Sequence, residues 1–111
     1  MSLRLATGVW VSAYLVRLRL ADIAHYVTAK GDQMAGAVLV KVALLDGTAR
    51  AFERHFDLEQ ETRVWCKVSE GSEADVDAMI ARAKARDRDL WVIELEDRAG
   101  RTLLDEPGLS E

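Results

Sequence analysis

The chain has 111 residues, of which 50% are hydrophobic and 31% are charged, and its formal net charge is −4. This length suits one domain with its own core, and the composition is that of a globular rather than a disordered protein. The net charge argues against general binding of nucleic acid or anionic membranes, although residues 1–68 carry +2 and the remainder −6.

The start of the chain and its cysteine content bear on location. The N-terminal MSLRLATGVW lacks the apolar core of a signal peptide, and no apolar run approaches the length of a membrane span. Cys66 is the only cysteine, which excludes an internal disulfide or a multi-cysteine zinc site. These features predict a cytoplasmic protein without membrane contact.

The first predicted element is a helix from Thr7 to Ile23, with Thr7 as candidate N-cap. Residues 17–20 alternate polar and apolar, as a half-buried strand would, but the helical pattern runs over eleven residues. Its apolar stripe consists of Val11, Tyr14, Leu15, Leu18 and Ala21. A strand is predicted over residues 24–30, because AHYVTAK is rich in β-forming residues, and Gly31-Asp32 ends it.

A β-hairpin between Gly31 and Phe56 is the central prediction, with strands near residues 36–45 and 48–56. Asp46-Gly47 between two β-rich segments is a strong signal for a two-residue type I′ turn. Such a turn pairs Leu44 with Ala49, Val42 with Ala51, and Lys41 with Phe52. The core side of the sheet would then carry Val38, Val40, Val42, Leu44, Ala49 and Ala51.

Three further elements are predicted in the second half of the chain. A strand covers residues 62–69, with alternate side chains pointing inward. A helix follows Ser72, because Ser72 and Asp75 approximate a capping box and an apolar stripe follows. The last long strand covers residues 90–97, with Trp91, Ile93 and Leu95 inward, and residues 98–101 turn the chain.

Together these elements predict an α+β domain with an antiparallel or mixed sheet of about five strands and two helices packed on one face. A single domain is expected over residues 1–111. Residues 104–111 are expected to form a flexible tail, although Leu103 and Leu104 could pack before it frays.

Several runs resemble the small alphaproteobacterial family catalogued as domain of unknown function 1491. They are Ala13-Tyr14-Leu15, Gly31-Asp32, residues 35–42, Leu45-Asp46-Gly47 and residues 89–101, with GAVLVKV and DLWVIELEDRAGR the most specific. The resemblance covers nearly the whole chain and implies a bacterial cytoplasmic protein of this size. It brings no established activity or catalytic residue. The chain departs from the family where a Gly-Ile-Pro loop is expected, because it reads Asp22-Ile23-Ala24.

The predicted register leaves one face of the sheet open, and this face is the candidate interaction surface. Its residues are Lys41, Arg50, Phe52, Arg54, Arg63, Trp65 and Lys67, next to an acidic strip of Glu94 and Glu96. Three interpretations compete: a solvated face whose long basic stems cover the aromatics, a surface for a protein partner or a second copy, and a nucleic-acid surface. The acidic strip and the net charge count against the third.

Candidate catalytic and metal-binding residues are isolated. His25 and His55 fall in different predicted strands without metal-ligand spacing, and Cys66 is expected to be a buried, inert thiol. Glu94 and Glu96 share a face, and we interpret them as a solvated strip rather than as a catalytic pair of carboxylates. We therefore predict no catalytic residue, metal site or cofactor.

The expected function is a non-catalytic interaction module that uses the open sheet face, with a homodimer as one form of the interaction. The alternative is a small enzyme or ligand-binding protein whose site is assembled from residues distant in the sequence.

Overall fold

The computed structural model describes residues 5–110. Residues 1–4 and Glu111, the last residue of the predicted tail, lie outside the described residues. The elements in chain order are α1 (Thr7–Leu20), β1 (Ala24–Ala29), β2 (Val38–Ala43), β3 (Thr48–Asp57), β4 (Thr62–Ser72), α2 (Glu73–Arg86) and β5 (Trp91–Glu96). No helix within residues 5–110 is long and apolar enough to cross a membrane.

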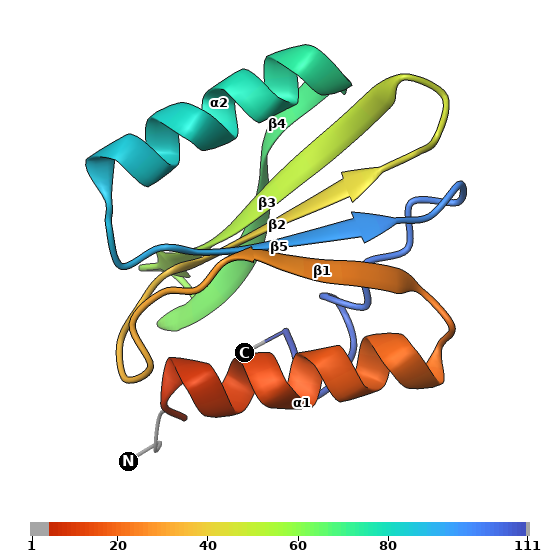
Figure 1. Ribbon diagram of the computed structural model, residues 1–111. Helices are drawn as coiled ribbons and strands as arrows, with labels where there is room; N and C mark the ends of the chain where they lie inside the picture. Colours follow the sequence, from red (N-terminus) through yellow and green to blue (C-terminus); the bar gives the residue numbers. More distant parts are fainter. Residues whose placement is uncertain (1–4, 111) are drawn as a thin grey trace.

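The five strands form one mixed sheet in the order β1-β5-β2-β3-β4, in which β2 and β5 are parallel and the other neighbours antiparallel. This confirms the α+β class and the two helices on a five-stranded sheet. The helices do not share a face, however: α1 and α2 lie on opposite sides of the sheet (Figure 1). The predicted placement of both helices on one face is therefore wrong.

The physical reason lies in β2, which is buried along its whole length. Its even-numbered residues, Val38, Val40 and Val42, face α1, whereas Leu39 faces α2. A strand in the middle of a sheet with helices on both sides needs apolar residues on both faces. The near-continuous apolar run VLVKVA is typical of such a strand.

The β2–β3 connection is one residue longer than predicted. The Leu44 N–H donates to the Thr48 carbonyl (3.0 Å), which leaves Leu45, Asp46 and Gly47 as the loop, with Leu45 at φ 63° and Gly47 at φ 90°. The Asp46 carboxylate accepts from the Thr48 N–H (2.9 Å) and holds this wider turn. The observed pairs are Ala43–Ala49, Val42–Arg50, Lys41–Ala51, Val40–Phe52 and Leu39–Glu53, so the predicted register is wrong by one residue. Lys41 consequently lies on the opposite face from Arg50 and Phe52.

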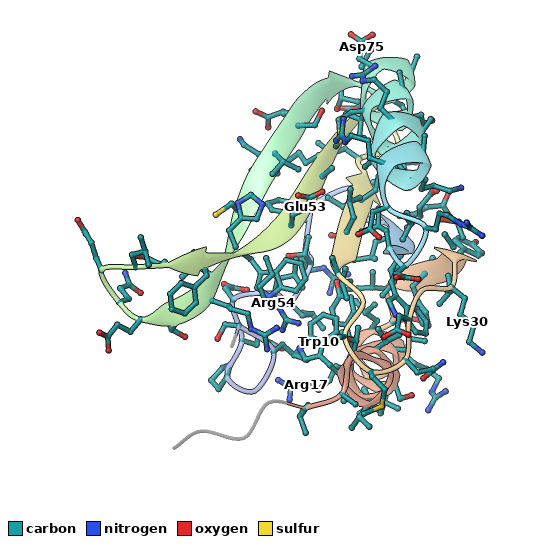
Figure 2. All side chains as sticks on the ribbon, turned by 90° about the vertical axis from the view of Figure 1, so that its left-hand side faces the viewer. Trp10, Arg17, Lys30, Glu53, Arg54 and Asp75 are labelled. Atoms are coloured by element: carbon teal, nitrogen blue, oxygen red, sulfur yellow. The ribbon has the colours of Figure 1, made fainter. Side chains whose placement is uncertain are left out.

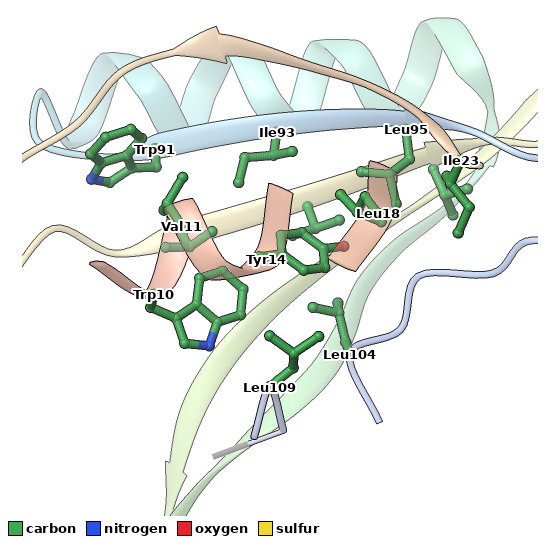
Figure 3. Packing of buried hydrophobic residues seen from close by; sticks show 13 residues of the cluster. Trp10, Val11, Tyr14, Leu18, Ile23, Trp91, Ile93, Leu95, Leu104 and Leu109 are labelled. Atoms are coloured by element: carbon green, nitrogen blue, oxygen red, sulfur yellow. The ribbon is translucent and has the colours of Figure 1, made fainter. Parts of the chain in front are cut away.

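The core consists of two clusters, one on each side of the sheet. On the α1 side, Trp10, Val11, Tyr14 and Leu18 pack against alternate residues of β2 and β5 (Figure 3). On the α2 side, the core residues are Leu39, Ala49, Ala51, Val76, Ile80, Ala83, Leu90 and Val92. The inward direction predicted for Trp91, Ile93 and Leu95 is confirmed, because all three belong to the α1-side cluster.

The ends of the helices show how local sequence sets the boundaries. The N-cap of α2 is Ser72, whose hydroxyl accepts from the Asp75 N–H, as predicted. The N-cap of α1 is Ala6, whereas the Thr7 hydroxyl donates to the Gly36 carbonyl (2.8 Å), so the predicted capping role of Thr7 is wrong. After α1, Asp22 adopts φ 59°, a conformation that glycine adopts most easily, at the position where the family resemblance leads us to expect glycine.

The C-terminal segment (residues 98–110) contains turns but no helix or strand. It crosses the α1 side of the sheet, and its Leu104 and Leu109 side chains are buried in the α1-side cluster. Figure 3 shows both leucines next to α1. The segment therefore covers a part of the sheet that the sequence predicted to be open.

Candidate functional site

An ion cluster around a buried lysine occupies the α2 side of the sheet. Lys41 on β2 is 3% exposed, and its ammonium group contacts three carboxylates. The distances from Nζ are 2.6 Å to Asp77, 2.8 Å to Glu73 and 3.5 Å to Glu94. Glu94 is the register partner of Lys41 on β5, whereas Glu73 and Asp77 are one turn apart at the start of α2. The cluster thus ties α2 to the two central strands.

The charge of Lys41 is fixed by this environment. Burial by itself would lower the pKa of Lys41, but its hydrogen bonds to Asp77 and Glu73 and the attraction of Glu94 raise the pKa above its usual range. A lysine used as a base or a nucleophile needs the opposite shift. The Lys41 cluster therefore serves as a structural joint between α2 and the sheet.

The other six residues predicted for the interaction surface do share one face, on the α1 side of the β3–β4 hairpin. The register pairs Phe52 with Lys67 and Arg54 with Trp65, and paired residues of antiparallel strands point to the same side. The remaining two members are Arg50 and Arg63. Arg50 contacts Glu70 at 2.8 Å, and Lys67 contacts the same carboxylate at 2.9 Å.

Aromatic rings gather where this face meets α1. Trp10 stacks on Tyr14 with ring centroids 4.9 Å apart, and it lies 5.4 Å from Trp65. The Arg54 guanidinium lies 5.2 Å from the Trp10 ring and 5.4 Å from the Trp65 ring, within the range of a cation–π contact. Figure 2 shows Arg54 next to Trp10. Within residues 5–110, the buried Trp10 Nε1 has no hydrogen-bond acceptor.

The C-terminal segment is fastened over these rings by side chains of α1 and β4. The Tyr14 hydroxyl donates to the Thr102 carbonyl (2.8 Å), and Trp65 Nε1 donates to the Leu109 carbonyl (3.1 Å). Arg17 donates to the Pro107 carbonyl (2.8 Å). These bonds and the two buried leucines hold the segment against the sheet.

Packing between the C-terminal segment and the β3–β4 face leaves a cavity of about 630 Å³. Apolar lining comes from Phe52 and Trp65 on the sheet and from Leu103 and Leu104 on the segment. Its remaining lining residues are Val64, Gly100, Arg101, Thr102, Asp105, Glu106 and Ser110. Arg101 also binds Asp97 through Nε and Nη2, which holds the pKa of that carboxyl below its usual range. This cavity has the size of a binding pocket and a lining that combines apolar with polar and charged residues.

Beyond the cavity, β3 and β4 extend as a two-stranded hairpin arm (residues 54–65). Pairing of β3 with β2 ends at Glu53, whereas its pairing with β4 continues to Asp57. Figure 2 shows the arm projecting away from the helices and the rest of the sheet. Phe56 on the arm is 52% exposed, and Leu58 near its tip is 82% exposed. The arm therefore presents large apolar side chains to solvent.

The isolated catalytic candidates are not brought together. His25 Nδ1 lies 2.8 Å from the Ile23 carbonyl at one edge of the sheet, whereas His55 Nε2 lies 3.2 Å from Glu53 on β3. Cys66 on β4 is half-buried rather than fully buried as expected. Among residues 5–110, no group of three or more His, Cys, Asp or Glu residues is placed to hold a metal ion.

Sequence reasoning missed the C-terminal contribution to the site. The sequence signal that the C-terminal residues pack against the domain is the presence of Leu104 and Leu109 among mostly polar residues. Phe56 continues the alternation of Phe52 and Arg54 and could have been added to the same face. The role of Trp10 depends on how α1 packs across the sheet, which local sequence does not specify.

The pH dependence of stability in the alkaline range tests whether the Tyr14 phenol is buried beneath the C-terminal segment. Burial raises the pKa of the Tyr14 phenol above its usual range, so above about pH 10 the unfolded chain loses a proton that the folded chain keeps. Stability should fall with rising pH, and Tyr14→Phe should remove roughly 1.4 kcal/mol per pH unit from that slope. Urea unfolding between pH 9 and about pH 11.5 measures the slope. Tyr26→Phe, which removes an exposed phenol, is the control, and equal slopes for both variants would contradict the prediction.

Comparison with known proteins gives a family and three similar structures. A family model described as "Protein of unknown function (DUF1491)" matches residues 5–105. A crystal structure of a family member from Caulobacter crescentus is 42% identical, with a TM-score of 0.83 over 94% of this chain and 98% of the other. An NMR structure from the same organism is 42% identical, with a TM-score of 0.81 over 96% and 97% of the two chains.

A more distant structure, protein Atu0922 from A. tumefaciens, is 26% identical with a TM-score of 0.70 over 85% of this chain and 86% of the other. No match is found among the curated proteins. The resemblance drawn from the sequence motifs is thereby confirmed over the fold as well as the sequence.

Proposed function

This chain belongs to DUF1491, a family of proteins of unknown function, and we propose that it is a protein-binding module of the bacterial cytoplasm. Its contact surface is the α1-side face of the hairpin arm together with the adjoining cavity. The surface contains four of the residues predicted from the sequence and adds Phe56. Arg54, Arg63 and Trp65 lie on the arm, and Phe52 lines the cavity.

The exposed arm is the observation that carries this proposal. Exposing Phe56 and Leu58 to water does not stabilise the two-stranded hairpin, because apolar side chains contribute to stability when they are buried. Aromatic and arginine side chains are the usual anchors of protein interfaces, and the arm combines both types. The net charge of −4 favours a protein partner over nucleic acid.

Affinity capture with matched variants tests the proposal. Isotope-labelled wild-type chain serves as bait in an extract of the source bacterium and is compared with Phe56→Ser and with Leu58→Ser. Leu20→Ser is the control, because Leu20 is 79% exposed but lies at the end of α1. We expect the amount of captured partner to fall by on the order of tenfold with each arm variant and to stay unchanged with the control. Equal capture by all four baits would overturn the proposal.

The cavity supports a second candidate, a small-molecule binding protein. Its volume lies in the range of ligand pockets, and its lining comes from segments far apart in the sequence. The same variants distinguish the two candidate functions, because Phe56→Ser and Leu58→Ser leave the cavity lining intact. Binding of a small apolar ligand that survives both substitutions, without any captured protein, would favour this candidate.

A further inference from the structure

We propose that the partner of the hairpin arm is a second copy of this chain, with Phe56 of each copy seated in the cavity of the other across a two-fold axis. The inference rests on the proposed function and specifies its partner. It is carried by the presence, on one face of one hairpin, of an exposed aromatic side chain and a cavity with a partly apolar lining.

Side-chain direction makes the exchange geometrically possible. Phe52, Arg54 and Phe56 alternate along β3 and therefore point to the same side of the hairpin. The cavity opens on that side, because Phe52 and Trp65 contribute to its lining. Two hairpins that pack face to face and antiparallel can therefore make both contacts at once, as a closed two-fold interface requires.

The cavity also suits the proposed occupant. Its apolar lining includes two aromatic and two leucine residues, and pockets of this size accept ligands larger than one aromatic ring. An inserted Phe56 ring would contact Phe52 and Trp65 of the other copy, and aromatic pairs add to the stabilisation that burial gives. A side chain that is 52% exposed in one copy would thus become buried in the pair.

Charge favours a second copy over an unrelated apolar segment. Arg63 is the register partner of Phe56 and lies beside it on the same face. The cavity lining includes the carboxylates of Asp105 and Glu106, of which Glu106 also contacts Arg17 at 3.8 Å. It also includes the guanidinium of Arg101, which is paired with Asp97. When Phe56 enters the cavity of the other copy, Arg63 comes to lie against the two lining carboxylates. The chain therefore carries both halves of a complementary surface.

Energy transfer between dye-labelled copies tests the inference. Cys66 is the only cysteine, and its register partner Glu53 places it on the opposite side of the hairpin, so a dye can be attached away from the contact. Phe56→Ser removes the inserted ring, and Ser110→Trp fills the cavity. Leu20→Ser is the control. We expect wild type and control to associate as concentration rises to the millimolar range, and each of the other two to associate more weakly by on the order of tenfold or more.

Mixing the two defective variants gives the sharpest result. A pair of one Phe56→Ser copy and one Ser110→Trp copy keeps one of the two contacts, whereas each variant paired with itself keeps neither. Transfer in the mixture should therefore exceed transfer in either variant alone. Asp105→Lys, a substitution at an exposed position, should also weaken association and covers the case in which Ser110→Trp does not fold.

The second-copy inference would be overturned if the wild-type chain stayed monomeric. It would also be overturned if energy transfer in the mixture did not exceed energy transfer in either variant alone. The proposed function is decided separately, because isotope labelling distinguishes bait from captured chain. A different protein that is lost with Phe56→Ser would uphold the protein-binding module while rejecting the second copy as its partner.

Discussion

Replacing Lys41 by methionine is expected to lower the free energy of unfolding by about 3 kcal/mol at neutral pH. Methionine keeps most of the apolar stem but removes the charge that holds Glu73, Asp77 and Glu94 together. The three carboxylates then repel one another at the junction of α2 with β2 and β5. The effect lies at the lower end of the range for broken buried ion pairs, because the carboxylates keep part of their hydration.

Urea unfolding of wild type and Lys41→Met at pH 7 measures this difference. Lys67→Met is the matched control, because Lys67 also contacts a carboxylate at 2.9 Å but is 47% exposed, and its loss should have little effect. Adding Asp77→Asn to Lys41→Met should recover part of the lost stability, since it relieves the repulsion. Equal stability of the two lysine variants would show that the Lys41 cluster contributes no more than a surface pair.

The same lysine explains why the sequence predicted the elements better than their faces. Helices and strands follow local patterns, and α2 and β5 lie within a few residues of their predicted bounds. Faces depend on register, and register depends on whether the turn at Asp46-Gly47 has two or three residues. Alternation with Val40 and Val42 predicts Lys41 on the open side of the sheet. Its actual partners lie on α2 and β5, and no local pattern indicates a contact between residues 36 positions apart.

The shared face of six of the seven predicted surface residues was predicted correctly, for a physical reason. Alternation within β3 and within β4 places Phe52 and Arg54 with Trp65 and Lys67, and this grouping depends only on how these two strands pair with each other. It therefore survived the error in the β2–β3 register, which moved Lys41 to the other side. The cover over this surface could not be predicted, because the C-terminal segment has neither helical nor strand periodicity.

The C-terminal segment accordingly decides how much of the aromatic face is exposed. It fills the corner between α1 and the sheet with Leu104 and Leu109, yet it leaves the cavity beside them. The sequence predicts a flexible tail, whereas the structure shows a segment held by hydrogen bonds from Tyr14 and Trp65. The two arrangements differ in how much the leucines of the segment contribute to the stability of the fold. In the first case the tail leucines contribute nothing to stability, whereas in the second they are core residues.

Substituting Leu109 by alanine is expected to cost about 3 kcal/mol of unfolding free energy, because a buried leucine truncated to alanine loses both its burial and its packing contacts. Leu109 is 2% exposed and belongs to the same cluster as Trp10 and Tyr14. Its backbone carbonyl, which accepts from Trp65, is unchanged by the substitution. Thermal and urea unfolding give the loss, and Leu20→Ala, at a position 79% exposed, gives the baseline. A loss no larger than that of Leu20→Ala would mean that the C-terminal segment is detached in solution and that the aromatic face is open.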